Sequence, residues 1–257
     1  MDYIIKDLHH ATEMDGLKDV QQSAWGYDES DLTPGSLFTV HAHMGGIVCA
    51  AFAVDSDIPI GFAYSFPAHY KNKMVQHSHM LALRPEHRAS GLAARLKQHQ
   101  RTRALELGYD LMTWTFDPAL TKNARLNLGK LGARAVSYHP DWYTIKGGIY
   151  AGLPADRFFV EWDLSQTLTE RPNTAPIGAY ALERNGVSAG TPNLDLTGIV
   201  LIESPRDIDA LKATDLAAAQ TWLTAHRLVF PHYFNQGYVV TDIHDTGERT
   251  FYHLECE

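Results

Sequence analysis

A short segment near the middle of the chain contains residues that are suited to binding a phosphate group. Arg88, Gly91 and Ala93 form an Arg-x-x-Gly-x-Ala pattern that joins a predicted strand to a predicted long helix. Small residues let the backbone approach a phosphate closely, and the first amides of a helix lack partners within the helix. Those amides also lie at the positive end of the helix dipole, so a diphosphate can accept their hydrogen bonds. The pattern predicts a site for a cofactor that contains a nucleotide.

Two histidines on the strand before this segment are candidates for acid–base chemistry. His77 and His79 are two residues apart, so a regular strand places both on one face, together with Leu81 and Leu83. An imidazole has an ordinary pKa of about 6.5 and can accept a proton at neutral pH. Because the chain has 14 histidines, a structural role for this pair is the alternative. No third residue at a suitable spacing completes a set of metal ligands, so no metal is expected.

The elements around these residues alternate between strand-like and helix-like patterns over residues 1–165, which is typical of helices packed on a sheet. Strands are predicted at residues 3–8, 46–54, 58–66, 77–83, 111–116, 133–143 and 158–164. Helices are predicted at residues 11–25, from residue 33 onward, at 91–107 and at 121–131. These patterns indicate an α+β fold with six or seven strands in its first part.

The remainder of the chain has a different character. Residues 166–198 are rich in Thr, Pro, Asn and Gly, and we interpret them as a long connection or an insertion with partial order. The pattern then predicts a strand at 199–203, one or two helices at 207–236 with an interruption near Pro231, and a hairpin at 238–255. The predicted parts are a domain at residues 1–165, a linker or insertion at 166–198 and a C-terminal extension at 199–257.

Composition and charge exclude several classes of protein. Hydrophobic residues make up 45% and charged residues 20% of the chain, and no apolar run approaches the roughly 18 residues that span a bilayer. The first residues lack the basic lead and apolar core of a signal peptide, so we expect a cytoplasmic protein with no membrane partner. The net charge of −8 argues against nucleic acid as a partner. The two cysteines, Cys49 and Cys256, provide neither a disulfide framework nor metal-ligand spacing.

The segment from Leu81 to Ala93 resembles the central motif of the GNAT acyltransferase superfamily, and the order of the predicted elements around it is similar too. The resemblance covers about residues 3–165. It implies a GNAT-like mixed, mostly antiparallel sheet of six to seven strands flanked by helices, with acyl-CoA as co-substrate, no metal, and a C-terminal α+β extension. In that family the strand before the loop bears a bulge, its backbone pairs with the pantetheine arm, and the loop holds the diphosphate. The residues that would hold the cofactor by this resemblance are Leu81, Ala82, Leu83, Arg88, Ala89, Ser90, Gly91, Leu92 and Ala93.

A second element of the family follows the next strand, where an Asn opens a helix and a Tyr protonates the leaving thiolate. Asn123 fits this pattern and would also contact the cofactor, but Leu128 stands where the Tyr is expected. The chain must therefore use another group, leave the thiolate to solvent, or not catalyse the reaction. Tyr138 and Tyr143 are the nearest substitutes in the sequence, and we select Tyr143 as a candidate catalytic residue beside the two histidines.

The resemblance implies transfer of an acetyl or succinyl group from acyl-CoA to the amine of a small molecule, with an amino acid as one acceptor class. His77 lies six residues before Leu83, where several members carry a catalytic Glu, which favours it as the base. One alternative is a non-catalytic module that binds acyl-CoA as a sensor or scaffold. Another is a dinucleotide-dependent enzyme, which fits poorly because the phosphate motif lies in the middle of the chain. A homodimer is one expectation for the assembly.

Overall fold

The computed structural model describes residues 3–143, 155–166 and 177–257. These residues form two compact units. Among the described residues, unit 1 comprises 3–114 and 163–166. Unit 2 comprises 115–143, 155–162 and 177–257.

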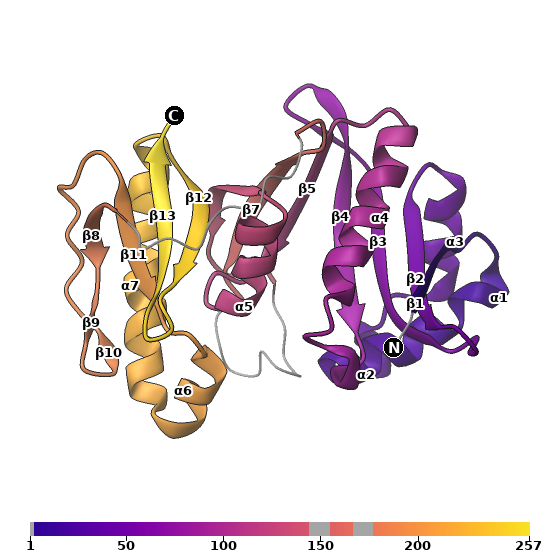
Figure 1. Ribbon diagram of the computed structural model, residues 1–257, viewed down its shortest axis with the longest axis horizontal. Coiled ribbons are helices and arrows are strands. Elements are labelled where there is room, and N and C mark those ends of the chain that lie inside the picture. The colour runs from indigo at the N-terminus through magenta and orange to yellow at the C-terminus, as the bar shows by residue number, and fades with distance from the viewer. Residues whose placement is uncertain (1–2, 144–154, 167–176) are drawn as a thin grey trace. The chain divides into compact units, whose positions relative to one another are not determined.

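Unit 1 is built on a twisted sheet whose strands follow one another in chain order (Figure 1). Its strands are β1 (Tyr3–Asp7), β2 (Ile47–Ala53), β3 (Pro59–Tyr70), β4 (Lys73–Leu83) and the first residues of β5 (Leu111–Phe116). Neighbouring strands from β1 to β4 are antiparallel, whereas β4 and β5 are parallel. Parallel strands need a crossover connection, and the helix α4 supplies it here.

Helices cover both faces of the unit 1 sheet. They are α1 (Ala11–Met14), α2 (Gly16–Trp25), the 3₁₀ turn η1 (Glu29–Asp31), α3 (Gly35–His43), the 3₁₀ turn η2 (Pro85–His87) and α4 (Leu92–Glu106). On one face, Leu17 and Phe38 pack with Phe62 and Ala82, so α2 and α3 lie on this side. On the other face, Leu92 and Leu96 of α4 pack with alternate side chains of the same strands. We call these the α1–α3 face and the α4 face.

Unit 2 contains the rest of the described chain. Its elements are the end of β5, α5 (Thr121–Ala124), the π-helical turn η3 (Arg125–Lys130), β6 (Arg134–His139), β7 (Arg157–Asp163), β8 (Ala179–Leu182), β9 (Arg184–Asn185), β10 (Ser188–Ala189), β11 (Val200–Ser204), α6 (Ile208–Thr214), α7 (Leu216–Asn235), β12 (Tyr238–Asp245) and β13 (Thr250–Cys256). Its sheet has the strand order β7-β6-β12-β13-β11-β8, and within it β8 and β11 form the parallel pair. The hairpin predicted for the C-terminal residues is confirmed as β12 and β13.

The predicted interruption near Pro231 is wrong, because α7 runs through this proline. The helical region breaks at Asp215 instead, where the carboxylate accepts a hydrogen bond from the Ala218 amide at 2.9 Å. An aspartate at this position stabilises the start of a helix by satisfying one of its free amides, so Asp215 ends α6 and begins α7. The proline removes one N–H from the helix, but the buried side chains of α7 hold it in place.

The expected α+β class is confirmed, with a mixed and mostly antiparallel sheet flanked by helices and further strands in the C-terminal part. Within the segment predicted to have partial order, residues 179–182 form β8 and join the sheet beside β11. Among the described residues, no helix is both long and apolar enough to cross a bilayer. The same residues contain no group of three or more potential ligands arranged to hold a metal ion.

Candidate functional site

The parallel strands β4 and β5 separate shortly after they meet. Their registered pairs are Gln76 with Met112 and His77 with Thr113. Beyond these pairs β4 continues to Leu83, and in the described part of the chain its residues from Ser78 onward have no partner on β5. The backbone groups on this edge of β4 are therefore available to a ligand that can pair with an extended strand. We call this region the β4–β5 opening.

A β-bulge lies at the start of the β4–β5 opening. Tyr64 of β3 is paired with Met80 and Ser65 with Ser78, so His79 is the extra residue of β4. A bulge changes the alternation of side chains along a strand. The expectation that His77, His79, Leu81 and Leu83 share one face assumed a regular strand, and the bulge makes it wrong. Both histidine rings contact Phe66 and lie on the α1–α3 face of the sheet, whereas Leu81 and Leu83 pack on the α4 face.

The two histidines belong to a cluster of rings on the α1–α3 face. The ring centroid of Phe66 lies 5.4 Å from that of His77 and 5.8 Å from that of His79. His41 of α3 stacks on Tyr64, with ring centroids 5.6 Å apart, and its Nδ1 is hydrogen-bonded to the Tyr64 hydroxyl. Tyr64 also meets His79 edge-on at 6.0 Å. The structure thus brings the two predicted histidines together with residues from α3 and β3.

His77 is held in place by β5. Its Nδ1 lies 3.0 Å from the Thr113 hydroxyl oxygen. Burial lowers the pKa of His77 to about 4, with smaller contributions from His79 and Lys97. Desolvation by the surrounding rings lowers the pKa of His79 as well, and His41 adds to this effect. Both imidazoles are therefore neutral at pH 7 and can accept a proton.

Sequence analysis did not identify His41, Tyr64 and Thr113 as members of this site. Their positions depend on the register of β3 against β4 and on the packing of α3, neither of which leaves a local pattern. The one available indication was that Tyr64 lies on a strand predicted to pair with the strand of His77. The pairing of β3 with β4, if it had no bulge, would not have placed Tyr64 beside His79.

The loop between β4 and α4 has the backbone that the phosphate motif predicts. Ala89 and Gly91 have positive φ angles of 60° and 81°. Gly91 precedes the first residue of α4. The Ser90 hydroxyl donates to the His87 carbonyl at 2.7 Å and accepts a hydrogen bond from the Leu92 amide at 3.3 Å. The start of α4 therefore presents backbone amides at the positive end of the helix dipole, where an anion can bind.

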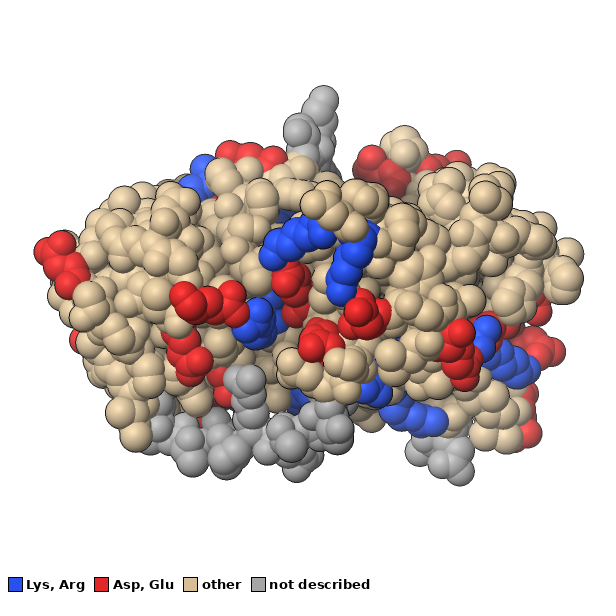
Figure 2. All heavy atoms as spheres, turned by 90° about the horizontal axis from the view of Figure 1, so that it is seen from above, with Lys and Arg blue, Asp and Glu red and all other residues tan. Residues whose placement is uncertain are grey.

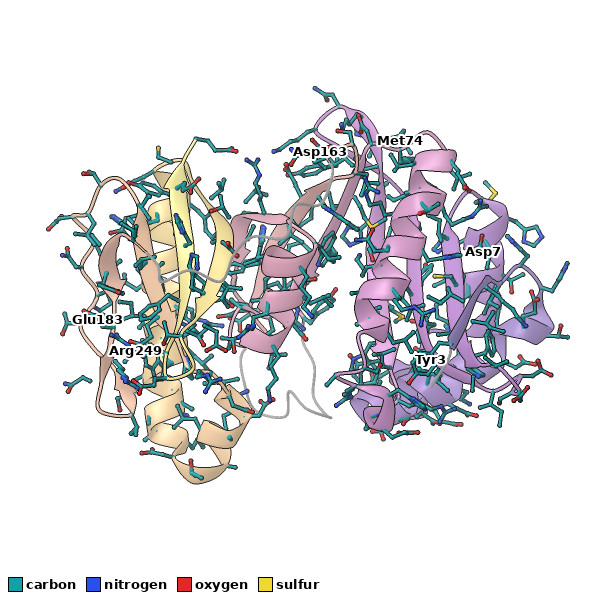
Figure 3. The ribbon with its side chains drawn as sticks, viewed as in Figure 1. Tyr3, Asp7, Met74, Asp163, Glu183 and Arg249 are labelled. Atoms are coloured by element: carbon teal, nitrogen blue, oxygen red, sulfur yellow. The ribbon has the colours of Figure 1, made fainter. Side chains whose placement is uncertain are left out.

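The side chains around this loop fix its position in unit 1. Arg88 is exposed, and its guanidinium donates to the Ala24 carbonyl at the end of α2, at 2.7 Å. Tyr3 of β1 lies beside the start of α4, with its hydroxyl 3.4 Å from Nδ1 of His87 (Figure 3). The guanidinium of Arg95 lies 5.9 Å from the centre of the Tyr3 ring. These contacts fix the loop against β1 and α2.

A close approach between β3 and β4 lies next to the same loop. A Cβ atom on Gly61 would come within 2.2 Å of Cδ2 of Leu83 and within 2.8 Å of the Ala82 carbonyl oxygen. Only glycine fits at this position without moving β4. The cofactor is expected to contact the backbone of Leu81, Ala82 and Leu83. This backbone is paired with β3 on one edge and, among the described residues, has no partner on β5 on the other edge.

The remaining predicted site residues lie in unit 2. Asn123 is an exposed residue of α5, and Leu128 is fully buried in the π-helical turn η3. The Tyr138 hydroxyl donates to Asp156, and burial together with this carboxylate raises the pKa of Tyr138. The Tyr143 ring is partly buried, with the guanidinium carbon of Arg157 5.1 Å from its centre. The catalytic role of Tyr143 and the cofactor contact of Asn123 stay predictions.

Acidic and basic side chains are mixed on the surface. On the face drawn in Figure 2, Lys and Arg side chains lie among Asp and Glu side chains and form no continuous basic area.

Comparison with known proteins gives matches among solved structures. No family model matches the chain, and no curated protein sequence matches it. A chain of the NatC complex bound to Gag peptide and CoA matches with a TM-score of 0.51 and 16% identity, over 64% of this chain and 100% of that chain. The N-acetyltransferase from Staphylococcus aureus Mu50 matches with a TM-score of 0.51 and 12% identity. The match covers 64% of this chain and 100% of that chain.

A third match has the same character. The ribosomal-protein-S18-alanine N-acetyltransferase from Escherichia coli has a TM-score of 0.50 and 13% identity, and it covers 65% of this chain and 96% of that chain. At such identities the likeness shows the fold alone. The share of this chain that these matches leave uncovered is in keeping with additional residues beyond the common fold.

Proposed function

Because the chain has the fold of the GNAT acetyltransferases, we propose that it is an acyl-CoA-dependent N-acyltransferase that acts on the amine of a small molecule. The observation that carries this proposal is the β4–β5 opening with the positive end of the α4 dipole beside it. Among the described residues, β4 has no partner on β5 from Ser78 to Leu83, and α4 offers an anion site one loop further on. A cofactor with an amide-containing arm and a diphosphate matches both features.

The chemistry of the opening supports a direct transfer. An amine that attacks a thioester must be neutral and must lose a proton during the reaction. His77 is the last residue of β4 that is paired with β5, and its neutral imidazole is hydrogen-bonded to Thr113. In the proposed reaction it accepts this proton directly or through a water molecule, and His79 borders the same space. A backbone amide of β4 near the bulge would stabilise the negative charge that develops on the thioester oxygen.

The proposed donors are acetyl-CoA and succinyl-CoA, and the proposed acceptors are amino acids and simple amines. The residues proposed to hold the cofactor are Leu81, Ala82, Leu83, Arg88, Ala89, Ser90, Gly91, Leu92, Ala93 and Asn123, and Tyr143 is proposed as a catalytic residue beside His77 and His79. A protein that binds acyl-CoA without turnover is the second candidate. It is favoured by one observation, the buried Leu128 in the helix where the family places its acid.

Two measurements test the proposal. Calorimetry with acetyl-CoA and with succinyl-CoA first establishes whether each donor binds. Release of free thiol is then followed for each donor with a panel of D- and L-amino acids and simple amines, and the acylated product is identified by mass spectrometry. The expected result is thiol release that depends on both the donor and an amine.

The possible outcomes separate the two candidates. Binding of acyl-CoA with no turnover on any amine of the panel would favour the sensor. No binding of either donor would contradict both candidates, since both need the β4–β5 opening to hold the cofactor.

A further inference from the structure

A lysine is buried directly behind the β4–β5 opening. Lys97 lies in the second turn of α4 and is only 2% exposed. Its Nζ donates to the Ser78 hydroxyl at 2.8 Å and to the Gln100 side-chain carbonyl at 3.2 Å. It also lies 3.5 Å from the Met112 sulfur and 3.9 Å from the centre of the Trp114 ring. The amine is therefore enclosed by α4, β4 and β5.

The contacts of Lys97 place its amine at the point where the strands separate. The last registered pair of β4 and β5 is His77 with Thr113. Ser78 and Trp114 are the next residues on the two strands, and the Lys97 amine contacts both of them. The histidine rings lie on the α1–α3 face and Lys97 lies on the α4 face. The narrow end of the opening thus has a proton acceptor on one side and an ammonium group on the other.

The length of a pantetheine arm brings the thioester to the same point. The arm between the diphosphate and the sulfur is about as long as four residues of extended chain. If the diphosphate lies at the start of α4, an arm that follows β4 from Leu83 toward its N-terminus ends near Ser78 and His79 at about 3.3 Å per residue. The sulfur then lies at the narrow end of the opening, within reach of the groups that contact Ser78.

A second observation supports a ligand beside Lys97. Ser78 donates to the Gln100 carbonyl oxygen at 2.8 Å, so this oxygen accepts two hydrogen bonds. The amide nitrogen of Gln100, in contrast, has no hydrogen-bond partner among the described residues, although the side chain is fully buried. A buried donor without an acceptor is costly, and an acceptor atom of a bound ligand would remove this cost.

We propose that Lys97 protonates the thiolate that leaves when an amine attacks an acyl-CoA thioester in the β4–β5 opening, an inference that rests on the proposed function. The amine nitrogen bonds to the thioester carbon, the carbon–sulfur bond breaks, and the sulfur leaves with the electron pair. The sulfur takes a proton from the Lys97 ammonium, while the attacking amine loses one to His77. Lys97 supplies the acid that the chain lacks at Leu128. Before the next cycle His77 gives its proton up to solvent, and the neutral Lys97 amine takes one up.

The environment of Lys97 is suited to this role. Burial lowers the pKa of Lys97 to about 7, and the Cys49 thiol on β2 opposes the shift. The titratable groups that face the amine are Cys49 from β2 and His77 from β4, while β5 contributes Met112 and Trp114. A thiol has an ordinary pKa of about 8.5, so an acid with a pKa near 7 can protonate a thiolate efficiently.

The decisive experiment titrates the thiol of bound CoA in the full chain, followed by the ultraviolet absorbance of the thiolate. An ammonium group next to the sulfur stabilises the thiolate, so bound CoA should contain at least about tenfold more thiolate at pH 7 than free CoA. Lys97→Met should remove this excess, and Lys97→Gln provides a second variant if the first does not fold. Arg103→Met, which removes a positive charge from the same helix, is the matched control and should keep the excess.

Kinetics provide the second measurement. Lys97→Met should lower kcat for acyl transfer about 100-fold while KM for acyl-CoA changes less than about twofold. Equal titration of CoA bound to wild type and to Lys97→Met would overturn the role of Lys97 and leave the proposed function intact. Failure of the wild type to bind CoA would overturn both.

Discussion

Buried ionisable groups are held in two ways, which Asp156 of unit 2 and the pair Lys97 and His77 of unit 1 illustrate. In unit 2, Asp156 accepts hydrogen bonds from Tyr138, from the Asp141 amide and from the Arg227 guanidinium. Burial alone would raise the pKa of Asp156, but hydrogen bonds from Arg227 and Tyr138 outweigh it and lower the pKa. In unit 1, burial dominates for Lys97 and His77 and moves both pKa values toward the neutral form.

The difference separates charges that stabilise the fold from groups that can exchange protons. Arg249 is a second example from unit 2, because its guanidinium contacts both Glu203, at 2.5 Å, and Glu183, at 2.8 Å (Figure 3). The contact with Glu203 holds the start of β13 to β11. Burial instead favours the neutral forms of Lys97 and His77, and a proton-transfer site needs groups of that kind.

The largest expected effect concerns the stability of unit 1 as a function of pH. Lys97 has a pKa of about 7 in the folded chain, whereas an exposed lysine has an ordinary pKa of 10.5. Between these values the unfolded chain binds more protons, so the free energy of unfolding rises with pH, by at most about 1.4 kcal/mol per pH unit. Wild type should therefore gain a few kcal/mol relative to Lys97→Met between pH 7 and 10. Urea denaturation of both proteins at several pH values measures this, and parallel profiles would show that Lys97 is not buried as described.

The second prediction tests the charge pairs of unit 2. Asp156→Ala leaves the buried Tyr138 hydroxyl without its acceptor and Arg227 with Asp141 alone, and it should lower the free energy of unfolding by about 3 kcal/mol at pH 7. Because its folded pKa is lowered, the contribution of Asp156 is present above a pH of about 3.8 and is lost as the pH falls further. Asp141→Ala removes an exposed carboxylate from the same Arg227 and is the control, with an expected loss of about 0.5 kcal/mol. Equal losses in urea denaturation would contradict the assignment.

The third prediction concerns the base. His77→Ala should lower kcat/KM for acyl transfer about 100-fold, because no group then accepts the proton of the attacking amine at this position. The wild-type rate should show no ionisation of this histidine near pH 6.5, since its pKa is lowered to about 4. His69→Ala replaces an exposed histidine of β3 and should leave the rate unchanged. A His77→Ala enzyme with the wild-type rate would exclude His77 as the base.

The smallest effect is expected at the phosphate loop. Gly91 and Gly186 both have positive φ angles, 81° and 64°, and in neither case would a Cβ atom meet a neighbour within 4 Å. Replacing either with Ala should therefore cost a similar backbone strain of about 1 kcal/mol. Only Gly91→Ala should also weaken CoA binding, by about fivefold to tenfold in calorimetry, because it displaces the amides at the start of α4. A similar loss of affinity in both variants would indicate a general effect on the fold.

Much of the fold follows from local patterns. The loop between β4 and α4 was predicted because small residues, a helix start and a strand end lie together in the sequence. The stop of α4 at Gly108 and the turn between β12 and β13 also have local causes. Asp215 shows how such patterns fail, since a single capping side chain decided where the C-terminal helices divide.

The candidate site was predictable only in part. His77 was visible because its type and its distance from the phosphate loop can be read along one strand. Lys97 was not, because its burial depends on the register of α4 against β4 and β5, and most lysines at such positions in a helix are exposed. The partners of His77 on α3 and β3 have the same long-range origin.

The bulge at His79 also affects how this strand tolerates mutation. A substitution in β4 changes one side chain, but loss of the single codon for residue 79 would restore regular pairing with β3. Successive side chains of a strand alternate between its faces. All side chains of β4 on one side of position 79 would therefore move to the opposite face of the sheet. Either His77 would leave the ring cluster or Leu81 and Leu83 would leave the core beneath α4. In the evolution of this chain, insertions and deletions at position 79 should therefore be rarer than substitutions there.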